Sequence, residues 1–257
     1  MAFPGFDLRN KSAVVIGGTS GIGRVLALGL AAAGADVAAS SRRKEQVEFV
    51  AAEIEALGRR TVRRSSDVCA RGSLEDLREA VLEKFGKVDI LVNCAGKIKR
   101  AATLDFPEQE WQEILETNLT GTLRGCQVFG KHMLERGYGR IINIASLTTF
   151  VSMVEVAAYA ASKAAVGALT KSLAVEWSKR GVLVNAIAPG VFRTALNSEL
   201  LDTPRGAELL ARTPMARFGH AEELVGAAVY LASDAASFTS GQILVVDGGF
   251  LASGVNQ

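Results

Sequence analysis

Short apolar runs alternate along this chain with longer segments in which apolar residues recur at helical spacing. The short runs are typical of buried strands and read SAVVIGG, ADVAASS, RTVRRSSDV, VDILVNCAG, GRIINIAS, VLVNAIAPG and QILVVDGG. The helical segments cover residues 22–33, 45–57, 74–85, 108–135 and 157–179. This alternation predicts an α/β fold built on a doubly wound, parallel, Rossmann-like sheet.

The whole chain, residues 1–257, is predicted to form a single domain. No Pro/Gly/Ser-rich linker, composition shift or internal repeat divides the sequence, and α/β domains of 257 residues are common. The periodic pattern weakens over residues 189–219, which contain several short helical pieces. A long irregular insert after a strand is a candidate lid over a substrate site.

The charge and cysteine content exclude several function classes. The net charge is +2 and basic residues are interspersed with acidic ones, which gives little support to nucleic-acid binding. The three cysteines show no C-x-x-C spacing, and the two histidines have no partners at metal-ligand spacing. The longest apolar stretch, residues 25–35, is too short to span a membrane, and the start of the chain shows no signal peptide. We therefore expect a soluble, cytoplasmic protein without a metal site or a membrane contact.

A glycine-rich loop follows the first predicted strand and opens the first helix. In VVIGGTSGIGR, Gly17, Gly21 and Gly23 have G-x-x-x-G-x-G spacing, which lets backbone amides and the helix N-terminus approach a pyrophosphate. A Walker A loop would need Lys and Ser or Thr where the chain has Arg24 and Val25. The loop therefore predicts a dinucleotide site, with a turn that binds nothing as the alternative.

Basic residues follow the second predicted strand, in the sequence ASSRRKE. A free ribose 2′-hydroxyl is usually recognised there by Asp or Glu, whereas a 2′-phosphate prefers arginine. Ser41, Arg42 and Arg43 thus favour NADP over NAD as the cofactor. The alternative is that both arginines are solvated charges that open the next helix.

Tyr159 and Lys163 form a pair in the sequence YAASK. Residues at i and i+4 are neighbours on one helix face, so their polar ends lie within reach of each other. A nearby ammonium favours the phenolate and lowers the pKa of the phenol, which would let Tyr159 exchange protons. The alternative is a core tyrosine beside a surface lysine.

Taken in order along the chain, these motifs resemble those of the short-chain dehydrogenase/reductase family. The resemblance adds NCAG at residues 93–96, Asn118, and Ser146, which lies thirteen residues before Tyr159. It covers the chain essentially from end to end and implies hydride transfer between a nicotinamide and a secondary alcohol or ketone. It implies that Ser146 binds the substrate oxygen and that Tyr159 is the acid/base. Lys163 would lower the pKa of Tyr159 and hold the nicotinamide ribose, and Asn118 would break a long helix and anchor a water in a proton relay.

The resemblance also implies a set of cofactor contacts. These are Gly17, Thr19, Ser20, Gly21, Ile22, Ser41, Arg42, Arg43, Asp67, Val68, Asn93, Ala95, Gly96, Tyr159, Lys163, Pro189, Gly190, Val191 and Thr194. Structural alternatives exist, since Asn93 could satisfy backbone groups and Thr194 could cap a helix. The sequence departs from the family pattern at Ile16, where threonine is usual, and in SLTTF, which lacks a common glycine.

A basic cluster suggests the type of substrate. Lys97, Lys99 and Arg100 follow the NCAG segment and could receive a carboxylate, or could be solvated surface charges. The chain is most similar to family members that oxidise sugar acids, of the gluconate 5-dehydrogenase and 2-deoxy-gluconate dehydrogenase type, which predicts a sugar acid or polyol as substrate. A 3-oxoacyl thioester reductase would use the same residues. A non-catalytic cofactor-sensing scaffold would be expected to lose Tyr159 or Lys163.

The end of the chain predicts self-association. The segment SGQILVVDGGFLASGVNQ forms an apolar strand and tail that would be an awkward exposed edge in a monomer. We expect a homo-oligomer, and the family resemblance implies a homotetramer.

Overall fold

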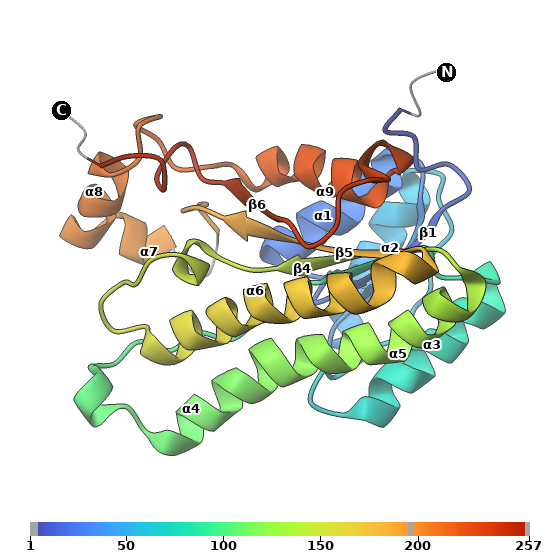
Figure 1. Ribbon diagram of the computed structural model, residues 1–257, viewed down its shortest axis with the longest axis horizontal. Helices are drawn as coiled ribbons and strands as arrows, with labels where there is room; N and C mark the ends of the chain where they lie inside the picture. The colour runs from blue at the N-terminus through green and yellow to red at the C-terminus, as the bar shows by residue number, and fades with distance from the viewer. Residues whose placement is uncertain (1–4, 195–197, 255–257) are drawn as a thin grey trace.

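The computed structural model describes residues 5–194 and 198–254, which fold around one parallel sheet. The strands are β1 (Ser12–Ile16), β2 (Asp36–Ser40), β3 (Ile90–Asn93), β4 (Gly139–Ile144), β5 (Val182–Pro189) and β6 (Ile243–Val246). They are ordered β2-β1-β3-β4-β5-β6, and every neighbouring pair is parallel (Figure 1). The predicted doubly wound α/β fold is therefore confirmed.

Helices cover both faces of the sheet. They are α1 (Gly21–Ala32), α2 (Lys44–Ala56), α3 (Arg71–Phe85), α4 (Glu108–Leu115), α5 (Gly121–Arg136), α6 (Ala157–Trp177), α7 (Ser198–Leu201), α8 (Pro204–Ala211) and α9 (Val225–Ala232). Helices α1, α2 and α9 pack into one core, and α3, α5 and α6 pack into the core on the opposite face. None of the described helices combines the length and the apolar character needed to cross a bilayer.

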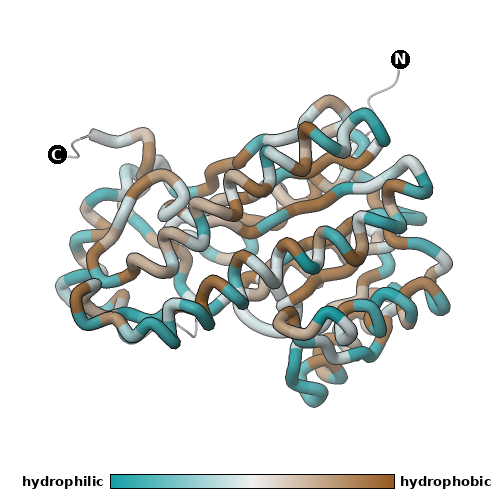
Figure 2. Tube along the Cα trace, turned by 60° about the horizontal axis from the view of Figure 1, so that its bottom comes forward, coloured by the Kyte–Doolittle hydropathy of each residue, from teal (hydrophilic) through white to brown (hydrophobic). Residues whose placement is uncertain are grey.

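Burial on both faces explains the continuous apolar runs of the strands. In β1, Ala13 and Val15 belong to the core under α1, whereas Val14 and Ile16 belong to the core under α3 and α5. Successive strand side chains point to opposite faces, so a strand covered on both sides must be apolar at every position. Helices have one face toward solvent and therefore mix polar and apolar residues. Figure 2 shows brown strands inside helices of mixed hydropathy.

The prediction of a strand at RTVRRSSDV is wrong, because this segment forms no strand in the described structure. It runs beside β2 but makes only two backbone contacts there, Val37 N to Arg60 O (3.0 Å) and Ser66 N to Ser41 O (3.0 Å). Between them, the Ser40 hydroxyl donates to the Arg64 carbonyl at 2.6 Å. A side chain thus takes a backbone acceptor, and the ladder needed for a strand does not form.

The helix predicted over residues 108–135 is interrupted by a π-helical segment, Glu116–Thr120, between α4 and α5. Such segments are rare and occur frequently at functional sites. Asn118 lies in this segment and is fully buried. The interruption turns the Asn118 side chain toward the chain that follows β3, as its hydrogen bonds show below.

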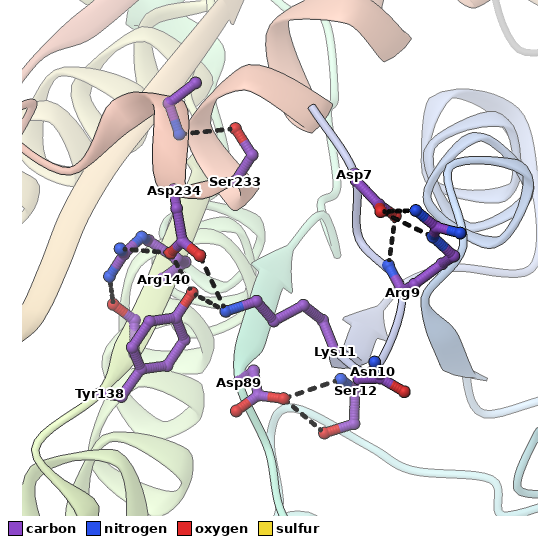
Figure 3. A network of polar contacts seen from close by, with 12 residues as sticks. Asp7, Arg9, Asn10, Lys11, Ser12, Asp89, Tyr138, Arg140, Ser233 and Asp234 are labelled. Atoms are coloured by element: carbon purple, nitrogen blue, oxygen red, sulfur yellow. Dashed lines mark hydrogen bonds and ion pairs between the residues drawn. The ribbon is translucent and has the colours of Figure 1, made fainter. Parts of the chain in front are cut away.

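A polar network closes the amino-terminal edge of the sheet (Figure 3). The Tyr138 ring lies between two cations, with Lys11 Nζ at 4.1 Å and Arg140 Cζ at 4.4 Å from its centroid. Its hydroxyl donates to Asp234 at 2.9 Å, and Asp234 also pairs with Lys11 at 3.3 Å and Arg140 at 3.2 Å. The network joins β1 and β4 to the turn after α9.

Asp89, at the same edge, is expected to make the fold sensitive to acid. Burial by itself raises the pKa of Asp89, but hydrogen bonds from Lys87 (2.9 Å), Ser12 N (3.0 Å) and Arg136 (3.1 Å) outweigh it and lower the pKa. A lowered folded-state pKa contributes stability that is present above the unfolded pKa and is lost as pH falls through the folded pKa. We expect Asp89→Asn to reduce the free energy of unfolding at pH 7 by about 3 kcal/mol.

Urea denaturation of both proteins from pH 7 downward measures this effect. The difference in unfolding free energy should begin to shrink below about pH 4, where the carboxylate of the unfolded chain gains its proton, and should vanish as the pH falls through the lowered pKa of the folded state. Asp202→Asn is the control, because Asp202 pairs with Arg193 at 2.9 Å on the surface and is 66% exposed. A difference that grows toward low pH would contradict the assignment.

Candidate active site

The carboxyl ends of the central strands open into one cleft of about 240 Å³. This edge is where ligands bind in open α/β sheets. The lining residues come from the start of α1, the loop after β3, the end of β4 and the loop that follows it, the start of α6, and the end of β5 and the segment between β5 and α9: Ile22, Ile98, Arg100, Ile144, Ala145, Ser146, Leu147, Thr148, Met153, Val156, Tyr159, Pro189, Gly190, Val191, Phe192, Thr194, Leu201, Arg205 and Leu209.

Ser146 and Tyr159 meet at the floor of this cleft. Ser146 follows β4 and caps the short turn Leu147–Thr149, where its hydroxyl oxygen accepts from Thr148 N at 3.2 Å. Tyr159 lies in the first turn of α6, and its phenol is hydrogen-bonded to Ser146. The two hydroxyls therefore face the same point of the cleft, where a substrate oxygen could contact both.

Burial raises the pKa of Tyr159 above the ordinary value of 10.0, and the hydrogen bond from Ser146 offsets only part of that effect. This corrects the expectation that the neighbouring ammonium lowers the pKa of the phenol. The physical reason is that desolvation disfavours the phenolate more strongly than the surrounding groups stabilise it. In this structure Tyr159 therefore keeps its proton at neutral pH.

Lys163 lies one turn further along α6 and is 5% exposed. Its Nζ atom is 5.7 Å from the centroid of the Tyr159 ring and donates to the Ile144 carbonyl at 2.6 Å. Burial lowers the pKa of Lys163 from 10.5 to about 8. The group therefore changes charge close to neutral pH, which is unusual for a lysine.

We expect this titration to be visible directly. In enzyme labelled with carbon-13 at lysine Cε, one resonance should titrate near pH 8 while solvated lysines titrate near 10.5. The resonance should disappear in Lys163→Met, which assigns it. If every lysine of the wild type titrates above about pH 10, the Lys163 amine is not desolvated as described.

Asn118 connects the loop after β3 to α6. Its Oδ1 accepts from Lys97 N at 2.7 Å, and its Nδ2 donates to Lys97 O at 2.9 Å and to the Ser162 hydroxyl at 3.0 Å. Ser162 in turn donates to the Tyr159 carbonyl at 2.7 Å. Ser162 lies within YAASK, and the sequence alone assigns it no role. The water-anchoring role of Asn118 remains a prediction. The structure shows that the Asn118 side chain ties the loop after β3 to α6 through these hydrogen bonds.

The glycine loop has the shape that a dinucleotide phosphate requires. Gly17 has φ of 78°, and a Cβ at Gly23 would lie 2.1 Å from the Gly17 carbonyl oxygen. Side chains are therefore excluded where the loop folds against the start of α1. The Thr19 hydroxyl contacts the Ser41 hydroxyl at 2.6 Å, which joins the loop to the end of β2. The residues present thus fit a pyrophosphate next to a ribose.

Arg42 and Arg43 are exposed after β2 and form no ion pair with any residue that the structure describes. Both guanidiniums are therefore available to a phosphate. Val68 is buried and Asp67 Oδ1 accepts from Cys69 N at 2.9 Å. Ser20 precedes α1 at its N-cap position beside Gly21.

The remaining predicted cofactor residues divide between the cleft and the core. Ile22, Pro189, Gly190, Val191 and Thr194 line the cleft together with Ser146 and Tyr159. A Cβ at Gly96 would lie 3.9 Å from Lys163 Nζ, and Ala95 packs against Gly17. Asn93 is placed differently, because its amide donates to Asn143 Oδ1 at 2.9 Å inside the core.

The basic cluster after NCAG is split by the structure. Arg100 lines the cleft, whereas Lys97 and Lys99 do not. Lys97 pairs with Glu113 and, at 3.1 Å, with Glu110, which also pairs with Lys99 at 2.9 Å. Only Arg100 of the three is in a position to meet a substrate in the cleft.

Sequence reasoning missed a second cleft arginine, Arg205, and its partner Glu155. Arg205 belongs to α8, within the segment predicted as a lid, and Leu201 and Leu209 from the same segment also line the cleft. Residues 195–197 of the predicted lid lie outside the described residues. No sequence signal could have joined Glu155 to Arg205, because fifty residues separate them.

Comparisons with known proteins agree with this geometry. A family model described as enoyl-(acyl carrier protein) reductase matches residues 17–251. The 2-dehydro-3-deoxy-D-gluconate 5-dehydrogenase of Bacillus subtilis (strain 168) is 43% identical over 96% of each chain. The D-threitol dehydrogenase of Mycolicibacterium smegmatis is 42% identical over 95% of this chain and 94% of its own.

A solved structure shows the same fold. It is a gluconate 5-dehydrogenase from Burkholderia cenocepacia J2315 in complex with NADP and tartrate. Its TM-score is 0.94 at 36% identity, and the match covers 99% of this chain and all of that one.

Proposed function

The chain belongs to the short-chain dehydrogenase/reductase family, and from this premise we propose that it is an NADP-dependent oxidoreductase acting on a secondary alcohol or ketone of a sugar acid. The observation that carries the proposal is the cleft itself, in which Ser146, Tyr159 and Arg100 face one space beside the predicted nicotinamide segment at Pro189. Hydroxyls for proton transfer and a cation for a carboxylate are thus present together.

The proposed chemistry follows from the positions of these side chains. NADP, when bound, supplies the exchange of hydride at its nicotinamide ring. Ser146 hydrogen-bonds the substrate oxygen and holds it beside the Tyr159 phenol. In the reducing direction Tyr159 donates its proton to that oxygen, and in the oxidising direction the phenolate receives it. Lys163 holds a cationic group next to the developing phenolate below about pH 8.

NADP is favoured by the end of β2. Arg42 and Arg43 are exposed and unpaired among the described residues, and a guanidinium matches a 2′-phosphate. The Burkholderia cenocepacia relative was solved with NADP, which supports the same choice.

The cleft supports a sugar acid over a neutral polyol. The two sequence relatives described above act on a keto sugar acid and on threitol, and their nearly equal identities do not separate these substrates. Arg100 separates them, since it lines the cleft and makes no hydrogen bond or ion pair with the described side chains. A 3-oxoacyl thioester as substrate is not favoured, because the relatives at this identity act on sugar acids and polyols. A non-catalytic scaffold role finds no support, because the chain retains both Tyr159 and Lys163.

Turnover of the purified protein tests this function. It should be assayed with NADP and NAD against sugar acids and neutral polyols, and in reverse with NADPH against 3-oxoacyl thioesters. We expect NADP-linked oxidation of a sugar acid, with a KM that rises about tenfold or more in Arg100→Gln as a charge-assisted contact is lost. Thioester reduction alone would refute the sugar-acid assignment.

We propose that the whole chain is one catalytic domain that works as a cytoplasmic homotetramer, with residues 189–219 covering the substrate. Support for the covering segment comes from Leu201, Arg205 and Leu209 in the cleft wall. The three cysteines are free, which supports a location in the reducing cytoplasm.

Self-association is supported by apolar side chains on the surface. Strand β6 is a partly exposed apolar edge strand, Phe238 before it is fully exposed, and Val175 on the adjoining α6 is 85% exposed. Sedimentation should give a tetramer that Phe238→Asp dissociates, and a wild-type monomer would refute association.

A further inference from the structure

The carboxylate of Glu155 forms an ion pair with Arg205, an arginine that lines the substrate cleft. Arg205 Nη1 lies 3.2 Å from Glu155 Oε2, and Arg205 Nη2 donates to the Val154 carbonyl at 2.6 Å. The Arg205 side chain is 26% exposed and that of Glu155 is 45% exposed, so the pair lies at the rim of the cleft. The carboxylate of this chain therefore already makes the type of contact that an acidic substrate would seek.

The same carboxylate also acts on Arg100. Burial lowers the pKa of Arg100, the positive charge of Arg205 lowers it further, and the negative charge of Glu155 acts in the opposite direction. Both arginines line the cleft, and the single carboxylate of Glu155 offsets only one of their two charges. Among the residues that the structure describes, this corner of the cleft thus carries one uncompensated positive charge, which suits a ligand with a single carboxylate.

The backbone of Glu155 is held in an unusual conformation. Its φ is 67°, in the left-handed region that costs energy for a residue with a side chain. Its carbonyl accepts from Ala101 N at 3.2 Å, next to Arg100, while its side chain reaches Arg205 on α8. These two contacts hold Glu155 beside Arg205 and near Arg100. A strained residue that persists at a binding cleft is a candidate for a functional role.

We propose that Glu155 occupies the place of the substrate's carboxylate, and that the carboxylate of a sugar acid displaces Glu155 from Arg205 and is then shared by Arg205 and Arg100. This inference rests on the proposed function and identifies the part of the cleft that recognises the acid. The exchange is feasible because exposed ion pairs are weak, so one carboxylate replaces another at little cost. Arg205 remains oriented during the exchange through its bond to the Val154 carbonyl.

The proposal makes Glu155 a specificity-determining residue. An acidic substrate must compete with Glu155, and its apparent affinity is reduced by the fraction of enzyme in which Arg205 is already paired. A neutral polyol brings no carboxylate to this corner, so its affinity does not depend on that exchange. Glu155 therefore weakens the preference of the cleft for acids over polyols.

Glu155→Gln tests the exchange, because glutamine preserves the shape and removes the charge. The ratio of KM for a sugar acid to KM for a neutral polyol should fall about two- to fivefold, in keeping with a weak ion pair. Glu55→Gln is the matched control: Glu55 pairs with Arg63 at 2.6 Å, is 49% exposed and lies on α2. The control should leave the ratio unchanged. An unchanged or increased ratio in Glu155→Gln would overturn the proposal.

A second measurement does not depend on turnover. Tartrate binding to the protein saturated with NADP, measured by calorimetry, should tighten about two- to fivefold in Glu155→Gln and weaken in Arg205→Gln. In the double variant the gain from Glu155→Gln should disappear, because the two residues act through one contact. Additive effects would overturn the exchange. Coupled effects in a protein that oxidises only polyols would uphold the anion corner and refute the sugar-acid substrate instead.

Discussion

Tyr159→Phe is expected to reduce turnover about a hundredfold to ten-thousandfold while the Kd for NADPH stays close to that of the wild type. The phenol, which is hydrogen-bonded to Ser146 in the cleft, is the proton donor that we propose, and phenylalanine keeps the ring that lines the cleft. Loss of the hydroxyl therefore removes proton transfer and leaves the cofactor surface in place. Steady-state kinetics and NADPH fluorescence titration measure the two effects separately.

Tyr230→Phe is the matched control for this prediction. Tyr230 lies on α9, and its hydroxyl contacts the Thr239 hydroxyl at 2.8 Å, away from the cleft. It loses the same atom from a partly buried tyrosine and should retain the turnover of the wild type. Full activity in Tyr159→Phe, or an equal loss in both variants, would remove Tyr159 as the acid/base.

Gly23→Ala is expected to weaken NADPH binding about tenfold to a hundredfold, because its added carbon has no room. That Cβ would lie 2.1 Å from the Gly17 carbonyl oxygen and 3.2 Å from Cys94 Sγ. The glycine loop would have to move away from α1, and overpacking of this kind costs about 1–3 kcal/mol. The same fluorescence titration measures the change in affinity.

The control for the loop is Gly226→Ala on α9. A Cβ at Gly226 would meet no atom within 4 Å, so alanine fits there without displacement. This variant should bind NADPH as the wild type does and should unfold at the same or a slightly higher urea concentration, since alanine favours helices. Wild-type affinity in Gly23→Ala would show that the closeness of Gly23 and Gly17 is not required for the cofactor.

The sequence by itself determined the parts of this protein that depend on local order along the chain. The alternation of apolar runs and helical periods predicted the parallel sheet, because each strand and helix must bury its own residues. Ser146 follows β4, and Tyr159 and Lys163 lie one turn apart on α6. Their approach to one another follows from strand ends and helix spacing, which are both readable from residue order.

Only the tertiary structure decided what depends on groups that are distant in sequence. Burial raised the pKa of Tyr159, where the local pair with Lys163 had suggested a decrease. Lys97 and Lys99 pair with Glu110 and Glu113 and do not line the cleft. Helix α8 brings Arg205 to Glu155 and to the cleft. Sequence periodicity reports which face of an element is buried, but desolvation and long-range ion pairs depend on which elements then pack together.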